Sequence, residues 1–317
     1  MSHPNLDLII VGGGPAGLCA AMYAGRGMLN AVLLERGLPG GELLNTEKVD
    51  DYPGFTTILG PDLALRMTEH AQAFGADIQQ ENVEGIYRLP DGSFRVTTSS
   101  GAEFFAPVVI LTAGGTPTKL DVPGELEYAG RGVSYCAVCD GAFFKGETIA
   151  VVGGGDAAVE EADYLTRYAS KVYIVHRRDE FRASKLVQER ALANPKIEVI
   201  WNTQVLEMVG GPKGLTHLNL SNHVTEARSQ LDVTGCFVFI GFKPNSGLVM
   251  EHVDHDSAGY LRTDDRMMTS IPGLFAAGDL RAQLTRQVTT AVGDATTAAI
   301  ATEKYLTERR SRLAGLA

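Results

Sequence analysis

Residues 8–17, LIIVGGGPAG, decide the fold of this chain. The first four are a wholly apolar run, which is typical of a parallel strand buried on both faces. The run leads into the spacing G-x-G-x-x-G and then into an alanine-rich segment, which predicts a helix from about Gly17 to Gly27. Strand, glycine turn and helix in this order predict a βαβ unit that binds a dinucleotide, with a phosphate at the helix N-terminus.

An acid follows the second strand of this unit. Residues 31–34 (AVLL) predict that strand, and Glu35 stands at its end. A carboxylate here can accept hydrogen bonds from the hydroxyl groups of a ribose. The glycine spacing alone is weak evidence, but strand, loop, helix, strand and acid together predict a dinucleotide-binding fold and not a purely structural turn.

The same pattern occurs again further along the chain. Residues 149–152 (IAVV) predict a strand, and residues 153–158 (GGGDAA) carry the G-x-G-x-x-A form of the loop. A helix is expected next, followed by a strand at residues 172–175 (VYIV). Two such units in one chain predict two bound dinucleotides.

The second unit has bases where the first has an acid. His176 stands at the position equivalent to Glu35, and Arg177, Arg178 and Arg182 follow it. A carboxylate would repel a ribose 2′-phosphate, whereas guanidinium groups pair with it through charge-assisted hydrogen bonds. The cluster therefore predicts a preference for NADPH over NADH. A solvated basic strand end is the alternative interpretation.

A pair of cysteines precedes the second glycine loop. Cys136 and Cys139 have the spacing C-x-x-C, which allows a disulfide, and Asp140 follows at once. An adjoining carboxylic acid can handle the proton of a thiol. A nicotinamide does not readily pass a hydride straight to a disulfide, whereas a flavin accepts the hydride and hands two electrons to sulfur. The sequence therefore predicts an electron relay.

Composition limits the other possibilities. The 317 residues suffice for two domains, and the formal net charge of −10 gives no sign of nucleic-acid binding. We find no signal peptide and no apolar run of the length a membrane helix needs, so a cytoplasmic location is expected. Cys19 and Cys236 are expected to be buried packing residues. No Cys/His spacing suits zinc, so we predict no metal site.

These motifs together resemble the low-molecular-weight, bacterial-type NADPH-dependent thioredoxin reductases. The resemblance runs nearly end to end and rests on residues 12–17, 39–41, 46–55, 136–141, 153–161, 176–182, 276–279 and 286–287. It implies an α/β fold of the class II pyridine nucleotide-disulfide oxidoreductases, with two Rossmann-like domains. The FAD domain would comprise residues 1–116 and 246–317, and the inserted NADPH domain, residues 117–245, would carry the C-x-x-C. Glycine and proline occur together at both joints, as they do in connectors.

The resemblance also implies a mechanism. NADPH would reduce FAD, and the reduced flavin would open the Cys136–Cys139 disulfide. The dithiol would then reduce thioredoxin by exchange, with Cys136 attacking the partner, Cys139 facing the flavin and Asp140 acting as general acid. Rotation of the inserted domain about its connectors would alternate the two half-reactions. The family further implies a homodimer joined through the flavin domains.

The cofactor residues that the resemblance implies fall into two sets. For FAD they are Gly12, Gly14, Pro15, Ala16, Gly17, Glu35, Arg36, Gly40, Gly41, Glu42, Leu43, Asn45, Val83, Gly278, Asp279, Arg286, Gln287 and Val288. For NADPH they are Gly153, Gly155, Asp156, Ala157, His176, Arg177, Arg178 and Arg182.

Some positions depart from the commonest family pattern. Residues 44–45, 111–115 and 293–295 differ, so the flavin environment is expected to differ from that of the common family members.

Three rival functions are alternatives to this one. The basic cluster argues against a ferredoxin-driven flavin disulfide reductase. A dithiol oxidase using oxygen would be expected to lack the NADPH determinants. A non-enzymatic redox sensor would not consume NADPH steadily in the presence of thioredoxin.

Overall fold

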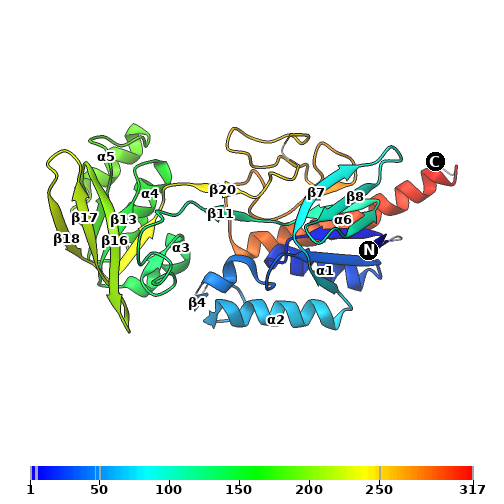
Figure 1. The fold of residues 1–317 in the computed structure, drawn as a ribbon, viewed down its shortest axis with the longest axis horizontal. Helices are drawn as coiled ribbons and strands as arrows, with labels where there is room; N and C mark the ends of the chain where they lie inside the picture. Colours follow the sequence, from blue (N-terminus) through cyan, green and yellow to red (C-terminus); the bar gives the residue numbers. More distant parts are fainter. Residues whose placement is uncertain (1, 4–5, 47, 50, 250, 316–317) are drawn as a thin grey trace. The chain divides into compact units, whose positions relative to one another are not determined.

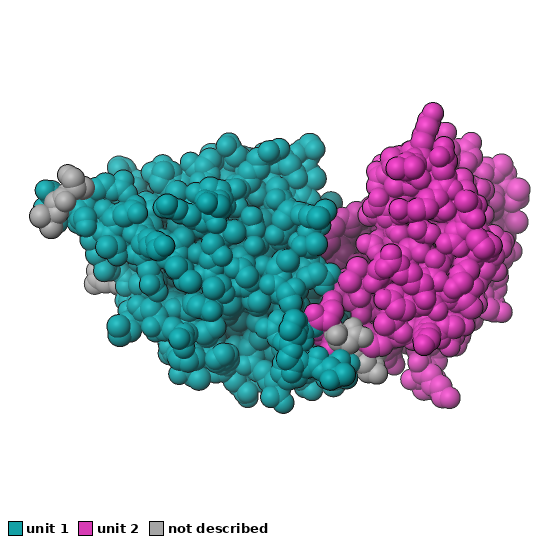
Figure 2. Space-filling model, turned by 180° about the vertical axis from the view of Figure 1, so that it is seen from behind, with its two compact units in different colours: residues 1–46, 52–116, 243–317 teal, residues 47–51, 117–242 magenta. Residues whose placement is uncertain are grey.

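The computed structural model describes residues 2–3, 6–46, 48–49, 51–249 and 251–315 (Figure 1). The chain divides into two compact units, which Figure 2 colours separately. The first comprises residues 1–46, 52–116 and 243–317, and the second residues 47–51 and 117–242. Glu47 and Asp50, which belong to a motif quoted above, lie outside the described residues.

A parallel sheet of five strands forms the centre of the first unit. Its order is β21 (Leu274–Ala276), β10 (Val108–Leu111), β2 (Leu8–Val11), β3 (Ala31–Glu35) and β6 (Asp77–Gln80). The predicted strands at residues 8–11 and 31–34 are confirmed.

Both faces of this sheet are covered, as the apolar run predicts. Alternate residues of a strand point to opposite faces. Leu8 and Ile10 pack in a core with helices α1 (Pro15–Arg26) and α6 (Val288–Leu313). Their neighbours Ile9 and Val11 pack in a second core, on the other face.

The second core lies against an antiparallel sheet. This sheet consists of β7 (Val83–Arg88), β8 (Phe94–Thr98) and β9 (Glu103–Ala106), and β1 (Ser2–His3) pairs in parallel with β9. Helix α2 (Gly60–Ala73) packs beside α1. Helix α1 begins at Pro15, two residues before the predicted start, because proline is well suited to a first turn whose N–H groups have no partner within the helix.

The second unit repeats this plan. Its parallel sheet has the order β12 (Val133–Ser134), β19 (Gly235–Val238), β13 (Thr148–Val152), β14 (Lys171–Val175) and β15 (Ile197–Ile200). The strands predicted at residues 149–152 and 172–175 are confirmed, and Cys236 is fully buried in β19, as expected.

Helices again cover one face and an antiparallel sheet the other. Ile149 and Val151 pack among residues of α4 (Asp156–Leu165) and α5 (Lys185–Ala193), whereas Ala150 and Val152 pack toward the antiparallel sheet. That sheet consists of β16 (Thr203–Gly211), β17 (Gly214–Asn222) and β18 (Arg228–Asp232). The shorter elements are η1 (Gly41–Asn45), β4 (Lys48–Val49), β5 (Ile58–Leu59), α3 (Ala137–Asp140) and η2 (Gly141–Phe144). The predicted α/β class with two Rossmann-like units is confirmed.

Two chain segments connect residues 117–242 of the second unit to the first unit. They contain β11 (Gly115–Pro117) and β20 (Phe242–Pro244), which pair with each other. The unit boundaries fall after Thr116 and after Phe242, within the segments in which glycine and proline occur together. Which cofactor each unit binds stays a prediction. No helix in the described ranges combines the length and apolar character needed to cross a bilayer.

Candidate active site

The first glycine loop is shaped by close backbone contact. Gly12 has a φ of +105°, and a Cβ there would lie 2.7 Å from the carbonyl oxygen of Thr112. A Cβ on Gly17 would collide with the carbonyl oxygen of Gly12. At Gly14, in contrast, the nearest atom to an added Cβ would be the Cα of Gly41, 3.9 Å away. Two glycines thus let the strand meet the helix, while the third leaves space at the helix N-terminus.

Glu35 is held against this loop. Its carboxylate accepts hydrogen bonds from the N–H groups of Gly13, at 2.6 Å, and Gly37, at 2.9 Å. The side chain is partly exposed. A carboxylate has more lone pairs than these two bonds use, so Glu35 can also accept a bond from a ribose hydroxyl.

Several other predicted flavin residues gather at the same end of the sheet. Gly40 donates its N–H to the carbonyl oxygen of Gly13 at 2.8 Å. A Cβ on Gly278 would lie 3.1 Å from the Cβ of Ala16. In η1, Leu43 is buried whereas Glu42 and Asn45 are exposed. Of the remaining residues predicted to bind FAD, Arg36 is exposed and Val83 packs against the second core.

Asp279 carries a buried oxygen without a partner. Among the described residues its Oδ1 has no hydrogen bond. Burial raises the pKa of Asp279 to about 6, and the charges of Glu42 and Asp294 act in the same direction, while Arg286 opposes them. An unpaired buried acceptor costs free energy and calls for an explanation. A ligand that donates a hydroxyl to this oxygen would supply one.

The start of α6 offers a second unpaired group. The guanidinium of Arg286 lies 4.1 Å from the ring centroid of Tyr260, yet its Nε has no hydrogen-bond partner in the described part of the chain. Gln287 is the N-cap and exchanges hydrogen bonds with Thr290, and Val288 begins the helix. Buried donor and acceptor together fit a polar ligand in this unit.

The second glycine loop has the same design as the first. Gly153 has a φ of +151°, and a Cβ there would lie 2.6 Å from the Cβ of Ala158. An added Cβ on Gly155 would meet nothing within 4 Å. At the first turn of α4, Asp156 and Ala157 are exposed. The carboxylate of Asp156 accepts the N–H of Ser184 at 2.7 Å, a bond that lowers the pKa of Asp156.

The predicted phosphate ligands lie beside this loop. Arg177, Arg178 and Arg182 are exposed, and none forms an ion pair with an acid among the residues that the structure describes. The N–H of Arg182 donates to the carbonyl oxygen of Gly154 at 2.7 Å. The segment that carries the three arginines is therefore hydrogen-bonded to the glycine loop.

His176 lies beneath the loop, and its side chain is buried. Its ring packs against Phe181 and Trp201, and its Nε2 lies 3.1 Å from the carbonyl oxygen of Glu180. Burial lowers the pKa of His176, and the positive charges of Arg178 and Arg182 contribute. A Cβ on Gly154 would collide with the ring. We therefore expect His176 to support the loop.

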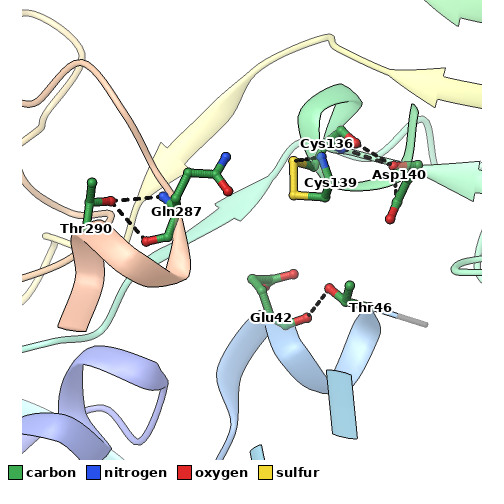
Figure 3. The surroundings of a disulfide bond; sticks show 8 residues. Glu42, Thr46, Cys136, Cys139, Asp140, Gln287 and Thr290 are labelled. Carbon is green, nitrogen blue, oxygen red and sulfur yellow. Dashed lines mark hydrogen bonds between the residues drawn. A yellow bond between two sulfur atoms is a disulfide. The ribbon is translucent and has the colours of Figure 1, made fainter. Parts of the chain in front are cut away.

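Cys136 and Cys139 form a disulfide, with their Cα atoms 5.3 Å apart (Figure 3). Cys136 is the N-cap of the short helix α3, and its Sγ accepts the N–H of Cys139 at 3.2 Å. Both cysteines are partly exposed, and Val138 between them is exposed. The bond is thus accessible to another reacting group.

Ser134, which the sequence analysis did not identify, connects the disulfide to its acid. Its buried hydroxyl donates to Oδ2 of Asp140 at 2.5 Å and accepts the N–H of Cys136 at 3.1 Å. The only signal in the sequence is a serine two residues before a helix N-cap. Since both bonds end on one hydroxyl, Asp140 is fixed relative to the backbone of Cys136.

Glu125 is a second residue that the sequence did not reveal. Its buried carboxylate accepts the N–H groups of Leu120, at 2.9 Å, and Asp121, at 2.7 Å. It also accepts the hydroxyl of Tyr135 at 2.9 Å, and burial together with Glu125 raises the pKa of Tyr135. The start of the 117–242 segment is thereby tied to the residue preceding Cys136.

Comparison with known proteins gives consistent relatives. A family profile for pyridine nucleotide-disulphide oxidoreductases matches residues 6–295. A thioredoxin reductase of Listeria innocua is 45% identical over 307 residues, covering 97% of this chain and 96% of its own length. One from Bacillus subtilis is 46% identical over the same shares of the two chains.

Solved structures of thioredoxin reductases are also similar to this chain. The thioredoxin reductase of Streptococcus pyogenes is 44% identical and has a TM-score of 0.92, covering 96% of this chain and 98% of its own. That of Lactococcus lactis, in its FR conformation, is 43% identical with a TM-score of 0.65, covering 96% of this chain and 100% of its own.

Replacement of Asp279 by Asn should stabilise the ligand-free chain at neutral pH. The folded-state pKa of Asp279 is raised, so its favourable contribution is lost as the pH rises through about 6. We expect Asp279→Asn to raise the free energy of unfolding by about 1–3 kcal/mol at pH 7.5 and by nearly nothing near pH 4. Urea unfolding at both pH values measures this, with the exposed Asp265→Asn as control. An equal effect at both pH values would contradict the assignment.

Proposed function

Because this chain belongs to the bacterial-type thioredoxin reductases of the pyridine nucleotide-disulphide oxidoreductase family, we propose that it transfers electrons from NADPH through FAD to thioredoxin. The observation that carries the proposal is the Cys136–Cys139 disulfide with Asp140 beside it, in a chain with two dinucleotide loops. The enzyme is then a thioredoxin-disulfide reductase.

We assign FAD to the first unit, because its residues fit that group. The space at Gly14 suits a pyrophosphate at the N-terminus of α1, and Glu35 suits a ribose. The unpartnered oxygen of Asp279 suits a hydroxyl of the flavin side chain. When bound, the flavin supplies two-electron transfer between a nicotinamide and a disulfide.

We assign NADPH to the second unit. The open side of Gly155 and the first turn of α4 suit the pyrophosphate. Arg177, Arg178 and Arg182 supply positive charge that no acid neutralises among the described residues, as a ribose 2′-phosphate requires. His176 supports the glycine loop from beneath.

The chemistry of this chain's own residues then follows from disulfide exchange. Two electrons convert the Cys136–Cys139 disulfide to a dithiol. The thiolate of Cys136 attacks the thioredoxin disulfide, forming a mixed disulfide and releasing one thioredoxin sulfur. The thiolate of Cys139 next attacks Cys136, which restores the disulfide and releases the second. Asp140, held by Ser134, delivers a proton to a departing thiolate.

The second unit contains the cysteine pair, Cys136 and Cys139, and also the nicotinamide site. The cysteine pair and the nicotinamide must each exchange electrons with one flavin. Rotation of this unit about its two connectors lets them do so in turn. Two solved relatives of nearly equal identity give TM-scores of 0.92 and 0.65, as expected if members of the family adopt different arrangements of their parts. By likeness to the family we also propose a cytoplasmic homodimer, which light scattering can check.

The central experiment measures NADPH oxidation with oxidised thioredoxin. We expect turnover that requires thioredoxin, is slower with NADH and is lost in Cys139→Ser. Cys19→Ser is the control, since Cys19 is a buried cysteine outside the proposed site. FAD-containing protein that fails to oxidise NADPH in the presence of thioredoxin would refute the proposal.

Replacement of the arginine cluster should affect one nucleotide only. Each charge-assisted bond to the 2′-phosphate contributes about 1.5–3 kcal/mol, so Arg177→Gln with Arg178→Gln should raise KM for NADPH about 100-fold or more. KM for NADH should change less than about threefold. Steady-state kinetics with both nucleotides measures this, and Arg228→Gln, on β18, serves as the control. A parallel rise for both nucleotides would argue against phosphate recognition.

Ser134 should act through Asp140. Without its hydroxyl the carboxylate loses a fixed position, so Ser134→Ala should lower kcat about tenfold. In an Asp140→Asn background the same change should have less than about a twofold effect, because coupled residues are not additive. Ser134→Thr, which keeps a hydroxyl, should retain most activity. Equal factors in both backgrounds would show that Ser134 is not coupled to Asp140.

A further inference from the structure

Asp294 lies within residues 293–295, a segment in which the frequent second glycine of a family motif is replaced. It lies in α6, where its Oδ1 forms an ion pair with Nη1 of Arg281 at 2.7 Å. The exposed fractions of the two side chains are only 12% and 14%. Its other oxygen, Oδ2, accepts the N–H of Gly278 at 3.1 Å. Burying two charges carries a desolvation cost, which the ion pair and the further hydrogen bonds of both side chains offset.

The carbonyl group of Gly278 is held as firmly as its N–H. Nε2 of Gln283 donates to this oxygen at 3.1 Å, and the N–H of Arg281 donates to it at 3.0 Å. Gln283 is oriented in turn, because its Oε1 accepts Nη1 of Arg281 at 3.2 Å. Nε of Arg281 donates to Thr263 at 2.9 Å. Gly278 is therefore held on both sides by one closed network.

The held residue directly precedes Asp279. Gly278 has a φ of +83°, a left-handed backbone conformation that glycine adopts without steric cost. Oδ1 of Asp279 is buried and has no partner in the described part of the chain. The bonds to Gly278 fix the backbone from which the Asp279 side chain extends, and the unpaired oxygen calls for a partner outside the described residues.

We propose that Asp294, with Arg281 and Gln283, is a positioning group that fixes Gly278 and thereby holds Asp279 ready for the flavin. The inference rests on the proposed function, since it assigns FAD to this unit. Through this network Asp294 determines how firmly the flavin is held.

The test is the rate at which FAD leaves the holoenzyme after dilution, followed by the rise in flavin fluorescence. Asp294→Asn should release FAD about tenfold faster, equal to about 1.4 kcal/mol. Gln283→Leu, which leaves the ion pair intact, should release it about threefold faster. The double variant Asp294→Asn with Arg281→Gln leaves no unpaired buried charge and should match Asp294→Asn. Asp265→Asn is the control.

The route through Asp279 is tested in an Asp279→Asn background. There Asp294→Asn should accelerate release by less than about twofold. Unchanged release in Asp294→Asn and Gln283→Leu, or full acceleration in the Asp279→Asn background, would overturn the inference alone. A wild-type chain that binds no FAD would overturn the proposed function and this inference together.

Discussion

The structure depends on one constraint, the close approach of a helix to the strand that precedes it. In the first unit the Cα of Gly17 packs against the carbonyl oxygen of Gly12, where no side chain fits. In the second unit Gly153 makes the same approach to Ala158. Only this contact brings the first turn of each helix to the carboxyl end of its sheet, where unpaired N–H groups can meet a phosphate. The sites in both units are built outward from it.

Around each loop, side chains that bond to the backbone fix the groups that carry the chemistry. Glu35 binds the loop in one unit, and Asp156 binds the N–H of Ser184 in the other. Ser134 does the same between Cys136 and Asp140. In each of these bonds a group exchanges a hydrogen bond to water for one to a protein partner, so each bond contributes little net stability. Their larger effect is to restrict the positions that a reacting group can take.

The sequence predicted the two folds and the dithiol because these depend on local patterns. An all-apolar run such as β2 identifies a strand buried on both faces, and C-x-x-C needs no long-range information. Ser134 and Glu125 were missed because their roles depend on partners brought near by folding. That His176 binds the cofactor, inferred from its equivalence to Glu35, stays a prediction. The place of its ring beneath the loop could not be predicted, because it depends on the missing Cβ of Gly154.

Asp279 shows how a binding site can oppose stability. Its Oδ1 is buried and has no partner among the described residues. Burial disfavours the charged form of the side chain, as do Glu42 and Asp294, and Arg286 offsets this only in part. The network around Gly278 fixes the backbone from which this side chain extends. A ligand hydroxyl that bonds to Oδ1 recovers the cost, and the recovered free energy adds to affinity. The unpaired oxygen therefore lowers the stability of the ligand-free chain and raises its affinity for the ligand.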